Sequence, residues 1–270
     1  MIRRFLREPP KYFAILSMVP KVFMAYQVWF WVSIVLNAIG MAILYFFWRA
    51  VYGSTEVIAG LTLNTTLTYI LFAQVFRPLT DIDLIFEFGF GLREGGILHL
   101  LLRPINFQAM YYFQNLGTLG VQMVLQIPMA LVATFVFGLK WHTDPAVWGA
   151  FLVSALLGFT ALFFFVYCVA CLTFYTTEVW GLGVLFFGMS IFLSGGLVPL
   201  AMMPDWLQTV VLAIPFSQAL AVPINILTGI TPLSEVPRIW LSQGLWVLGL
   251  WLVSNLVFKV AIRKVTVQGG

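Results

Sequence analysis

The chain has 270 residues, of which 61% are hydrophobic and only 9% are charged. Soluble proteins carry about one-quarter charged residues, and a soluble domain of this size needs polar side chains to cover its surface. The composition therefore predicts a membrane protein. It argues against disorder, collagen, a disulfide scaffold and nucleic-acid binding, because only two cysteines are present and the 14 Lys and Arg are not gathered on one basic face.

Residues 1–27 are expected to lie on the membrane surface ahead of the first span. Pro9 and Pro10 suit the first turn of a helix, and apolar side chains beneath basic ones are typical of an interfacial amphipathic helix. The apolar run from Tyr12 to Pro20 is short and closes at Lys21 without a small-residue cleavage site. We therefore do not interpret this segment as a cleavable targeting peptide.

A helix that crosses the hydrocarbon core needs about 20 mostly apolar residues. Six stretches qualify: Val28–Trp48, Val57–Phe76, Tyr111–Leu139, Ala146–Phe174, Val179–Leu200 and Ile239–Val260. A seventh apolar region, within residues 201–230, is cut by Pro204, Pro215 and Pro223 into pieces too short to cross. We predict one all-α membrane domain covering residues 1–270, with six transmembrane helices and short re-entrant helices on the outer side between spans five and six.

The distribution of basic residues predicts the orientation, because Lys and Arg concentrate in cytoplasmic loops. With six spans, both termini lie on the same side. If that side is cytoplasmic, the inner Lys and Arg are Arg3, Arg4, Arg7, Lys11, Lys21, Arg77, Arg93, Arg103, Lys259, Arg263 and Lys264. The outer ones are Arg49, Lys140 and Arg238. This bias favours cytoplasmic termini.

The predicted spans lack the groups that would drive transport or catalysis. None carries an ionisable residue near its middle, which ion-coupled carriers need, and no G-x-x-x-x-G-K-[ST] phosphate-binding loop occurs. Cys168 and Cys171 have the spacing of a metal or redox pair, but no third ligand is near them, so we favour a structural role. We expect no catalytic residue and no metal site, and energy for uphill transport would come from a partner.

Uncharged polar residues do occur inside two spans. They are Asn64 and Thr68 in the second span and Asn115, Thr118, Gln122 and Gln126 in the third. The four in the third span fall within an arc of about 80° at roughly 100° per residue. Such groups either join helices by hydrogen bonds or flank a substrate path, and helix packing is the more common use. In the fourth span, small residues at every fourth position from Ala146 to Gly158 permit close helix contact.

A cluster of charges of both signs follows the second span. It consists of Arg77, Asp81, Asp83, Glu87, Arg93, Glu94 and Arg103. We expect this segment, residues 77–106, to face the cytoplasm as short amphipathic pieces around a flexible Gly89-Phe-Gly91 break. Charged rims and apolar anchors suit docking to a soluble protein, although the composition equally allows an interfacial loop solvated by its charges.

Two motif regions resemble the permease subunits of the second class of ATP-binding cassette exporters. Arg93-Glu-Gly-Gly-Ile-Leu98 and Leu100-Leu-Leu-Arg-Pro-Ile105 match the R-E-G-x-[IL] and L-L-x-R-P-[IV] run of that family. Ser194-Gly-Gly-Leu-Val-Pro-Leu200 resembles its Gly-rich outer turn after the fifth span, and it is followed by Met203-Pro-Asp-Trp-Leu207 and Ile214-Pro-Phe216. Within that turn Gly195 and Gly196 allow a tight bend ahead of Pro199.

The resemblance implies a non-catalytic subunit that pairs with a second permease, identical or homologous, and binds two copies of a cytoplasmic ATPase. ATP and magnesium would be bound by that ATPase and not by this chain. In the family, the loop after the second span supplies a coupling helix, so the resemblance assigns the charged residues of 77–106 to ATPase docking. Closure of the ATPase pair would then rearrange the first, second and fifth spans around a central path.

The leading hypothesis is therefore a bacterial inner-membrane exporter subunit for a hydrophobic or amphiphilic substrate, such as a drug, a lipid or a lipid-linked molecule. The alternative is a stand-alone channel or secondary carrier, which would copurify with no ATPase. An intramembrane enzyme ranks last, because it would need charged or metal-ligating groups at membrane depth.

Overall fold

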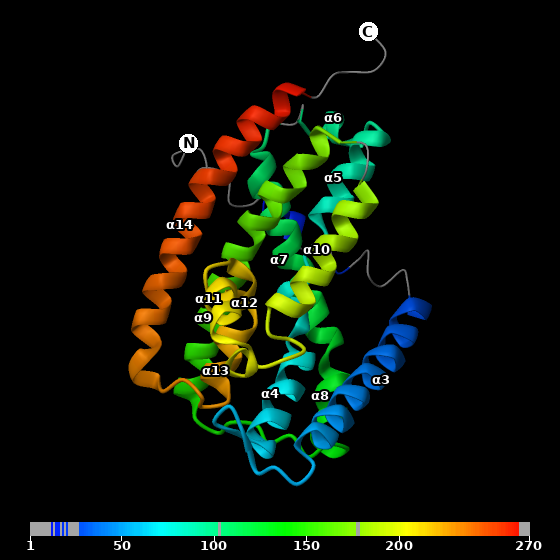
Figure 1. Cartoon of the computed structure of the whole chain (residues 1–270). Helices are drawn as coiled ribbons and strands as arrows, with labels where there is room; N and C mark the ends of the chain where they lie inside the picture. The colour runs from blue at the N-terminus through cyan, green and yellow to red at the C-terminus, as the bar shows by residue number, and fades with distance from the viewer. Residues whose placement is uncertain are drawn as a thin grey trace.

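The structure, a computed structural model, describes residues 12, 14–16, 18, 20, 27–101, 104–176 and 179–264. The first half contains α3 (Gln27–Tyr52), β1 (Val57–Ile58), β2 (Leu61–Thr62), α4 (Leu63–Val75), η1 (Arg77–Thr80), α5 (Leu84–Arg93), α6 (Gly96–Leu101), α7 (Phe107–Leu125) and α8 (Ile127–Phe135). The second half contains α9 (Pro145–Ala170), η2 (Cys171–Phe174), α10 (Val179–Leu193), η3 (Leu200–Met202), α11 (Asp205–Leu212), α12 (Pro215–Ala219), α13 (Ala221–Leu227), η4 (Leu233–Glu235), α14 (Val236–Ala261) and η5 (Ile262–Lys264). These helices form an elongated bundle (Figure 1).

Four helices of the described chain are long and apolar enough to cross a membrane: Trp31–Tyr52, Phe107–Phe135, Pro145–Phe174 and Leu233–Lys264. These spans support the prediction of an all-α membrane protein. The second and fifth predicted spans differ, because α4 has 13 residues and α10 has 15. At about 1.5 Å per residue, neither helix alone reaches across a hydrocarbon core of about 30 Å.

The second predicted span, Val57–Phe76, is wrong at its start. Its first residues form the antiparallel hairpin of β1 and β2, in which Ala59 and Gly60 turn the chain with positive φ angles of 48° and 78°. The Thr62 side chain then accepts a hydrogen bond from the Thr65 amide at 3.3 Å and caps α4. The hairpin therefore takes up residues that hydropathy alone assigns to the span.

The helix that follows is interrupted at η1 and resumes as α5. Pro78 stands in η1 and cannot donate the backbone hydrogen bond that would continue α4. Figure 1 shows α4 and α5 following one another along the long axis of the bundle. The predicted Gly89-Phe-Gly91 break does not form, because both glycines lie inside the continuous helix α5.

Helix α9 is the centre of the bundle. Of its most apolar 18-residue stretch, 61% is buried inside the chain, against 11% for Trp31–Tyr52 and 17% for Leu233–Lys264. It packs on α14, α12, α13 and α5. At Gly158, an added Cβ would overlap the Gln218 carbonyl of α12, so only glycine allows the two backbones this close approach.

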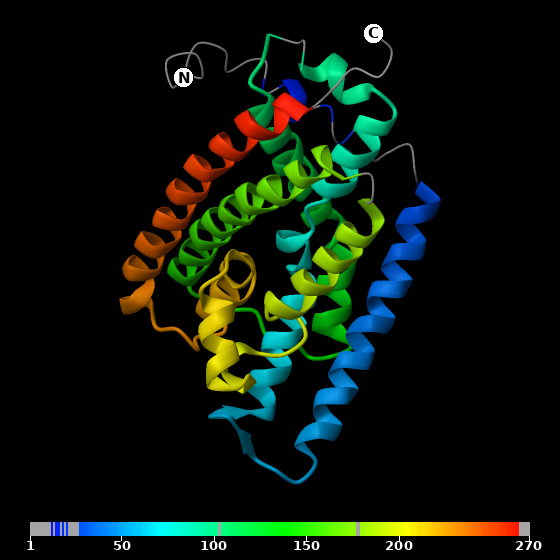
Figure 2. The same cartoon turned by 45° about the horizontal axis from the view of Figure 1, so that its top comes forward.

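The region expected to be re-entrant contains three short helices, α11, α12 and α13. Helix α11 and the stretch Pro215–Leu227 meet at an angle of 71°, and Pro215 begins α12. The buried Gln243 amide of α14 donates to the carbonyls of Ser154 and Gln218, both at 3.1 Å. These bonds join α14, α9 and α12, and Figure 2 shows the short helices lying against that side of the bundle.

Candidate functional site

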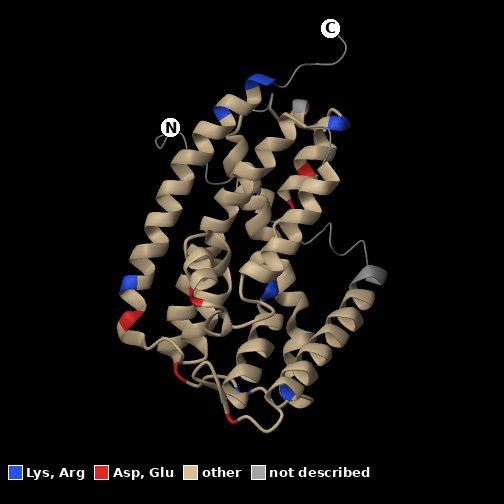
Figure 3. Ribbon diagram, in the orientation of Figure 1, with Lys and Arg blue, Asp and Glu red and all other residues tan. Residues whose placement is uncertain are grey.

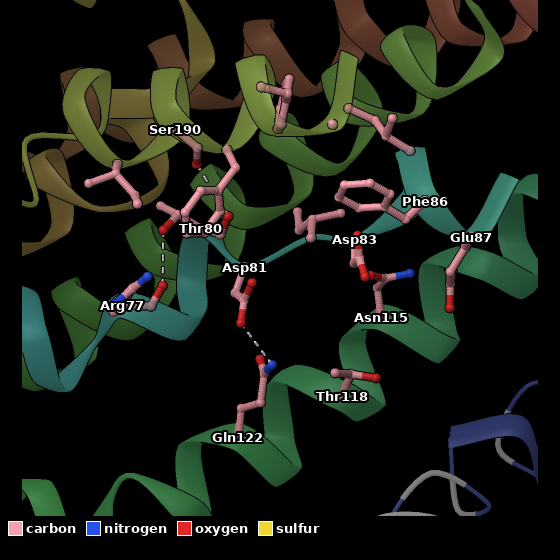
Figure 4. A pocket seen from close by; sticks show the side chains of 16 residues that line it. Arg77, Thr80, Asp81, Asp83, Phe86, Glu87, Asn115, Thr118, Gln122 and Ser190 are labelled. Atoms are coloured by element: carbon pink, nitrogen blue, oxygen red, sulfur yellow. Dashed lines mark hydrogen bonds between the residues drawn. The ribbon is translucent and has the colours of Figure 1, made fainter. Parts of the chain in front are cut away.

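A cavity of about 460 Å³ lies where η1 and the start of α5 face α7 and α10. Its polar lining consists of Arg77, Thr80, Asp81, Asp83, Glu87, Asn115, Thr118, Gln122 and Ser190. Its apolar lining consists of Ile82, Ile85, Phe86, Gly183, Phe186, Phe187 and Ile191. We call this space the central cavity, and Figure 4 shows its labelled side chains converging from these elements.

Hydrogen bonds hold the break between α4 and α5 against α7 and α10. The Gln122 amide donates to Asp81 Oδ2 at 3.2 Å, and the Gln114 amide donates to Glu87 Oε1 at 2.9 Å. On the other side, the Ser190 hydroxyl donates to the Thr80 carbonyl at 3.4 Å. The break is therefore a positioned element and not a free loop.

The central cavity lies midway along the bundle and not at its end, and it opens to the surface at the exposed residues Asp81 and Asp83. Gln122, the partner of Asp81, stands near the middle of the 29-residue helix Phe107–Phe135. Figure 3 shows most charged residues at the two ends of the bundle, with a few between them. Residues 77–87, which the sequence analysis assigned to a cytoplasmic segment, therefore lie beside this helix, and the Asp81 carboxylate stands level with its middle.

Carboxylates dominate the electrostatics of the central cavity. Among the described lining residues, Asp81, Asp83 and Glu87 carry carboxylates and Arg77 alone carries a positive charge. Within the described part of the chain, none of these four side chains forms an ion pair. The described lining therefore carries an excess of negative charge that no described residue neutralises through an ion pair.

Two acceptor atoms at the central cavity also lack a hydrogen-bond partner. Glu87 Oε2 and Gln122 Oε1 are buried, and neither accepts a bond within the described residues. Buried polar atoms are almost always satisfied in folded proteins. Unsatisfied acceptors beside unpaired carboxylates indicate a site suited to a ligand that donates hydrogen bonds.

The structure brings together two residue sets that the sequence kept apart. Four of the predicted docking residues, Arg77, Asp81, Asp83 and Glu87, share the cavity with Asn115, Thr118 and Gln122 of the predicted polar face. Gln126 lies instead at the junction of α7 and α8. Asn64 and Thr68 lie on α4 and do not line the central cavity.

The remaining predicted docking residues lie elsewhere. Arg93 and Glu94 are exposed at the far end of α5, and Arg103 lies outside the described residues. The residues predicted to dock an ATPase therefore lie in two places. Asp81, Asp83 and Glu87 line the cavity, whereas Arg93 and Glu94 lie at the far end of α5.

The predicted outer turn is tight and is bonded to α4. Gly195 has a φ of 83°, a left-handed conformation that favours glycine. The Tyr69 hydroxyl donates to the Gly195 carbonyl at 3.0 Å, and the Gln74 amide donates to the Gly196 carbonyl at 3.2 Å. Pro199 then leads into η3.

Sequence reasoning missed Gln114, Ser190 and the aromatic wall of α10. Gln114 carried a signal, because it stands four residues before Thr118 and eight before Gln122 on the same helical face. No sequence pattern pointed to Ser190, Phe186 or Phe187, because all three lie in a nearly uniform apolar stretch. Their role depends on the approach of η1, which is distant in sequence.

Among the described residues, no group of three or more His, Cys, Asp and Glu is placed to hold a metal ion. Cys171 is buried in η2 and Cys168 is half-buried in α9, and both are free thiols. The chemistry of the central cavity is therefore that of carboxylates, amides, hydroxyls and aromatic rings.

The structure is thus a helical membrane protein with a polar cavity midway along its bundle. A family model described as ABC-2 family transporter protein matches residues 38–269, most of the chain. The chain therefore belongs to the ABC-2 transporter family, as the sequence motifs predicted. Membership implies a permease, suggests a non-catalytic membrane subunit and implies association with an ATP-binding cassette ATPase. No curated protein and no solved structure matches the chain.

Proposed function

We propose that this chain is the permease subunit of an ATP-driven exporter in a bacterial inner membrane. It forms half of a path for a hydrophobic or amphiphilic substrate and works with two copies of a cytoplasmic ATPase, which bind the ATP and magnesium. The observation that carries the proposal is the arrangement of α5, which joins an exposed charged tip at Arg93 and Glu94 to the acidic lining of the central cavity.

Helix α5 is built to transmit displacement. Its ten residues span about 15 Å, and its buried Phe88 packs in an aromatic cluster. The cluster partners are Phe107, Tyr111, Tyr167 and Phe174, with ring centroids 5.0–5.8 Å from Phe88. A helix held in this way moves as a rigid body. Motion of an ATPase docked at Glu94 would therefore shift Asp83 and Glu87 in the cavity.

The exposure of the cavity carboxylates supports pairing with a second permease, identical or homologous. Asp81 and Asp83 are exposed in the single chain, yet a carboxylate level with mid-span is costly when it faces lipid. Such groups usually face a bundle interior or a water-filled space. A second permease subunit against this face would enclose them.

The described charges support cytoplasmic termini. The end where α5 and α14 finish carries Arg93, Lys259, Arg263 and Lys264 with one acid, Glu94. The opposite end carries Arg49, Lys140 and Arg238 with Glu56, Asp144 and Glu235. The first end is thus the more basic, as expected for a cytoplasmic side. Arg77 lies beside the cavity and no longer counts toward either end, and the basic residues before Tyr12 lie outside the described residues.

Charge reversal at the α5 tip tests the coupling. With the chain purified together with its ATPase, Arg93→Glu combined with Glu94→Lys should reduce ATPase recovery at least about tenfold, because docking rims depend on charge complementarity. Glu56→Lys, an exposed acid in the turn before β1 at the opposite end, is the matched control and should retain the ATPase. Full recovery with the α5 double variant, at normal membrane insertion, would refute docking at this tip.

A stand-alone carrier is favoured by one observation, the carboxylates level with mid-span, since ion-coupled carriers use such groups. Transport measurements in liposomes that contain the chain alone distinguish a carrier from an exporter subunit. An exporter subunit should move no substrate under a proton or sodium gradient and should require the ATPase with ATP. Gradient-driven uptake without an ATPase would favour the carrier.

A further inference from the structure

We infer that the central cavity binds a protonated amine attached to an apolar body. The inference rests on the proposed function only in identifying this ligand as the transported substrate, because binding itself needs no ATPase. Four features of the cavity support it: its charge, its unpartnered acceptors, its aromatic wall and its volume.

The charge of the lining selects a cation. Three carboxylates, those of Asp81, Asp83 and Glu87, stand against one guanidinium, and no ion pair joins these groups within the described residues. Away from bulk water, an unpaired carboxylate is costly unless a positive partner compensates it. An anionic headgroup would add to the excess negative charge, and a neutral ligand would leave it uncompensated.

The unpartnered atoms select a cation that donates hydrogen bonds. Glu87 Oε2 and Gln122 Oε1, on facing elements, are both buried acceptors without donors. A primary ammonium group carries three N–H donors on one positive centre and can satisfy one of these acceptors together with an Asp carboxylate of the lining. A metal ion is disfavoured, since the described residues contain no group of three or more His, Cys, Asp and Glu suited to one.

The aromatic wall and the volume select an apolar body on that amine. Phe86 of α5 and Phe186 and Phe187 of α10 line the cavity, and aromatic faces attract cations as well as apolar groups. Phe186 is 8% exposed, whereas Phe187 is 51% exposed. The wall thus runs from the interior to the surface of the chain. A volume of about 460 Å³ lies in the usual range for drug-sized ligands.

A matched pair of fluorescent probes tests the inference. Monodansylcadaverine has a dansyl ring and a primary amine that is protonated at neutral pH, and its N-acetyl derivative has the same body without the charge. The purified chain, in phosphatidylcholine nanodiscs without an ATPase, is titrated with each probe against empty nanodiscs. We expect the amine to bind at least about tenfold more tightly than the acetylated probe, because loss of one charged partner costs that much or more.

The variants assign this preference to the cavity. Glu87→Gln should reduce the preference for the amine to less than about threefold, while Glu56→Gln, outside the cavity, should leave it unchanged. Asp81→Asn, at an exposed cavity position, provides a second variant if Glu87→Gln does not fold. Equal binding of the two probes to the unaltered chain, or equal effects of the Glu87 and Glu56 variants, would overturn the inference.

The inference and the proposed function fail separately. An ATPase that copurifies with a chain showing no amine preference removes only the inference. An amine preference in a chain that binds no ATPase keeps the cavity assignment and removes the exporter.

Discussion

Gly195 shows how one residue fixes the distance between two elements that are far apart in sequence. Its positive φ turns the chain directly after α10, and its carbonyl accepts the Tyr69 hydroxyl bond from α4. A Cβ at this position would stand 2.7 Å from the Tyr69 hydroxyl oxygen and 2.9 Å from the Ala221 Cβ. Both the backbone angle and the space therefore require glycine.

Gly195→Ala should destabilise the protein by about 1–3 kcal/mol from backbone strain alone, with an added steric cost. The matched control is Gly188→Ala, since Gly188 lies within α10 with no atom near an added Cβ. Alanine there should be neutral or stabilising by up to about 1 kcal/mol. Thermal unfolding in detergent compares the stabilities of the two variants. Equal unfolding midpoints would show that the turn tolerates a side chain at Gly195.

The residue level also shows how far the site could be predicted. The polar face of α7 follows from helical spacing, and Asn115, Thr118 and Gln122 do share one cavity. The approach of Asp81 to Gln122 does not follow, because it joins residues 41 positions apart and depends on how the α4–α5 break packs. Sequence spacing predicts which residues share one face of a helix, whereas tertiary packing decides which helix faces contact each other.

At the level of elements, a cap and a proline set helix boundaries that hydropathy does not show. Helix α4 begins after the Thr62 cap and gives way at Pro78 to the 3₁₀ turn, although apolar residues begin earlier in the chain. The Gly89-Phe-Gly91 stretch was predicted to be flexible, yet the packing of α5 on α9 and α10 keeps it helical. Tertiary contacts there outweigh the low helix propensity of glycine.

The contact between α9 and α12 holds the short helices in place, and Gly158 makes it possible. Gly158→Ala would drive a Cβ into the α12 backbone, which yields less readily than a side chain. We expect a loss of about 1–3 kcal/mol and release of the Gln243 bond to Gln218. Gly149→Ala lies on the same helix with open space around an added Cβ. It should be neutral in the same thermal unfolding assay, and equal loss in both variants would contradict a specific contact.

At the level of the whole molecule, charge is sorted by position along the bundle. Most charged residues lie at the two ends of the bundle, and those between them include the four that line the central cavity (Figure 3). The low charge content predicted a membrane protein, and the lack of ionisable residues near the middle of the predicted spans predicted one without its own energy source. The structure adds that Arg77, Asp81, Asp83 and Glu87 line one cavity.

The orientation of the bundle decides whether α5 can meet a cytoplasmic ATPase at all. In a background with Cys168→Ala and Cys171→Ala, one new thiol is placed at each end: Thr143→Cys before α9, and Gly96→Cys at the start of α6. Both positions are exposed. A membrane-impermeant maleimide should label Thr143→Cys in intact cells and Gly96→Cys only after permeabilisation, since the basic end is expected inside. The reverse pattern would put Arg93 and Glu94 outside the cell, out of reach of any ATPase, and would leave the carrier as the function consistent with the cavity.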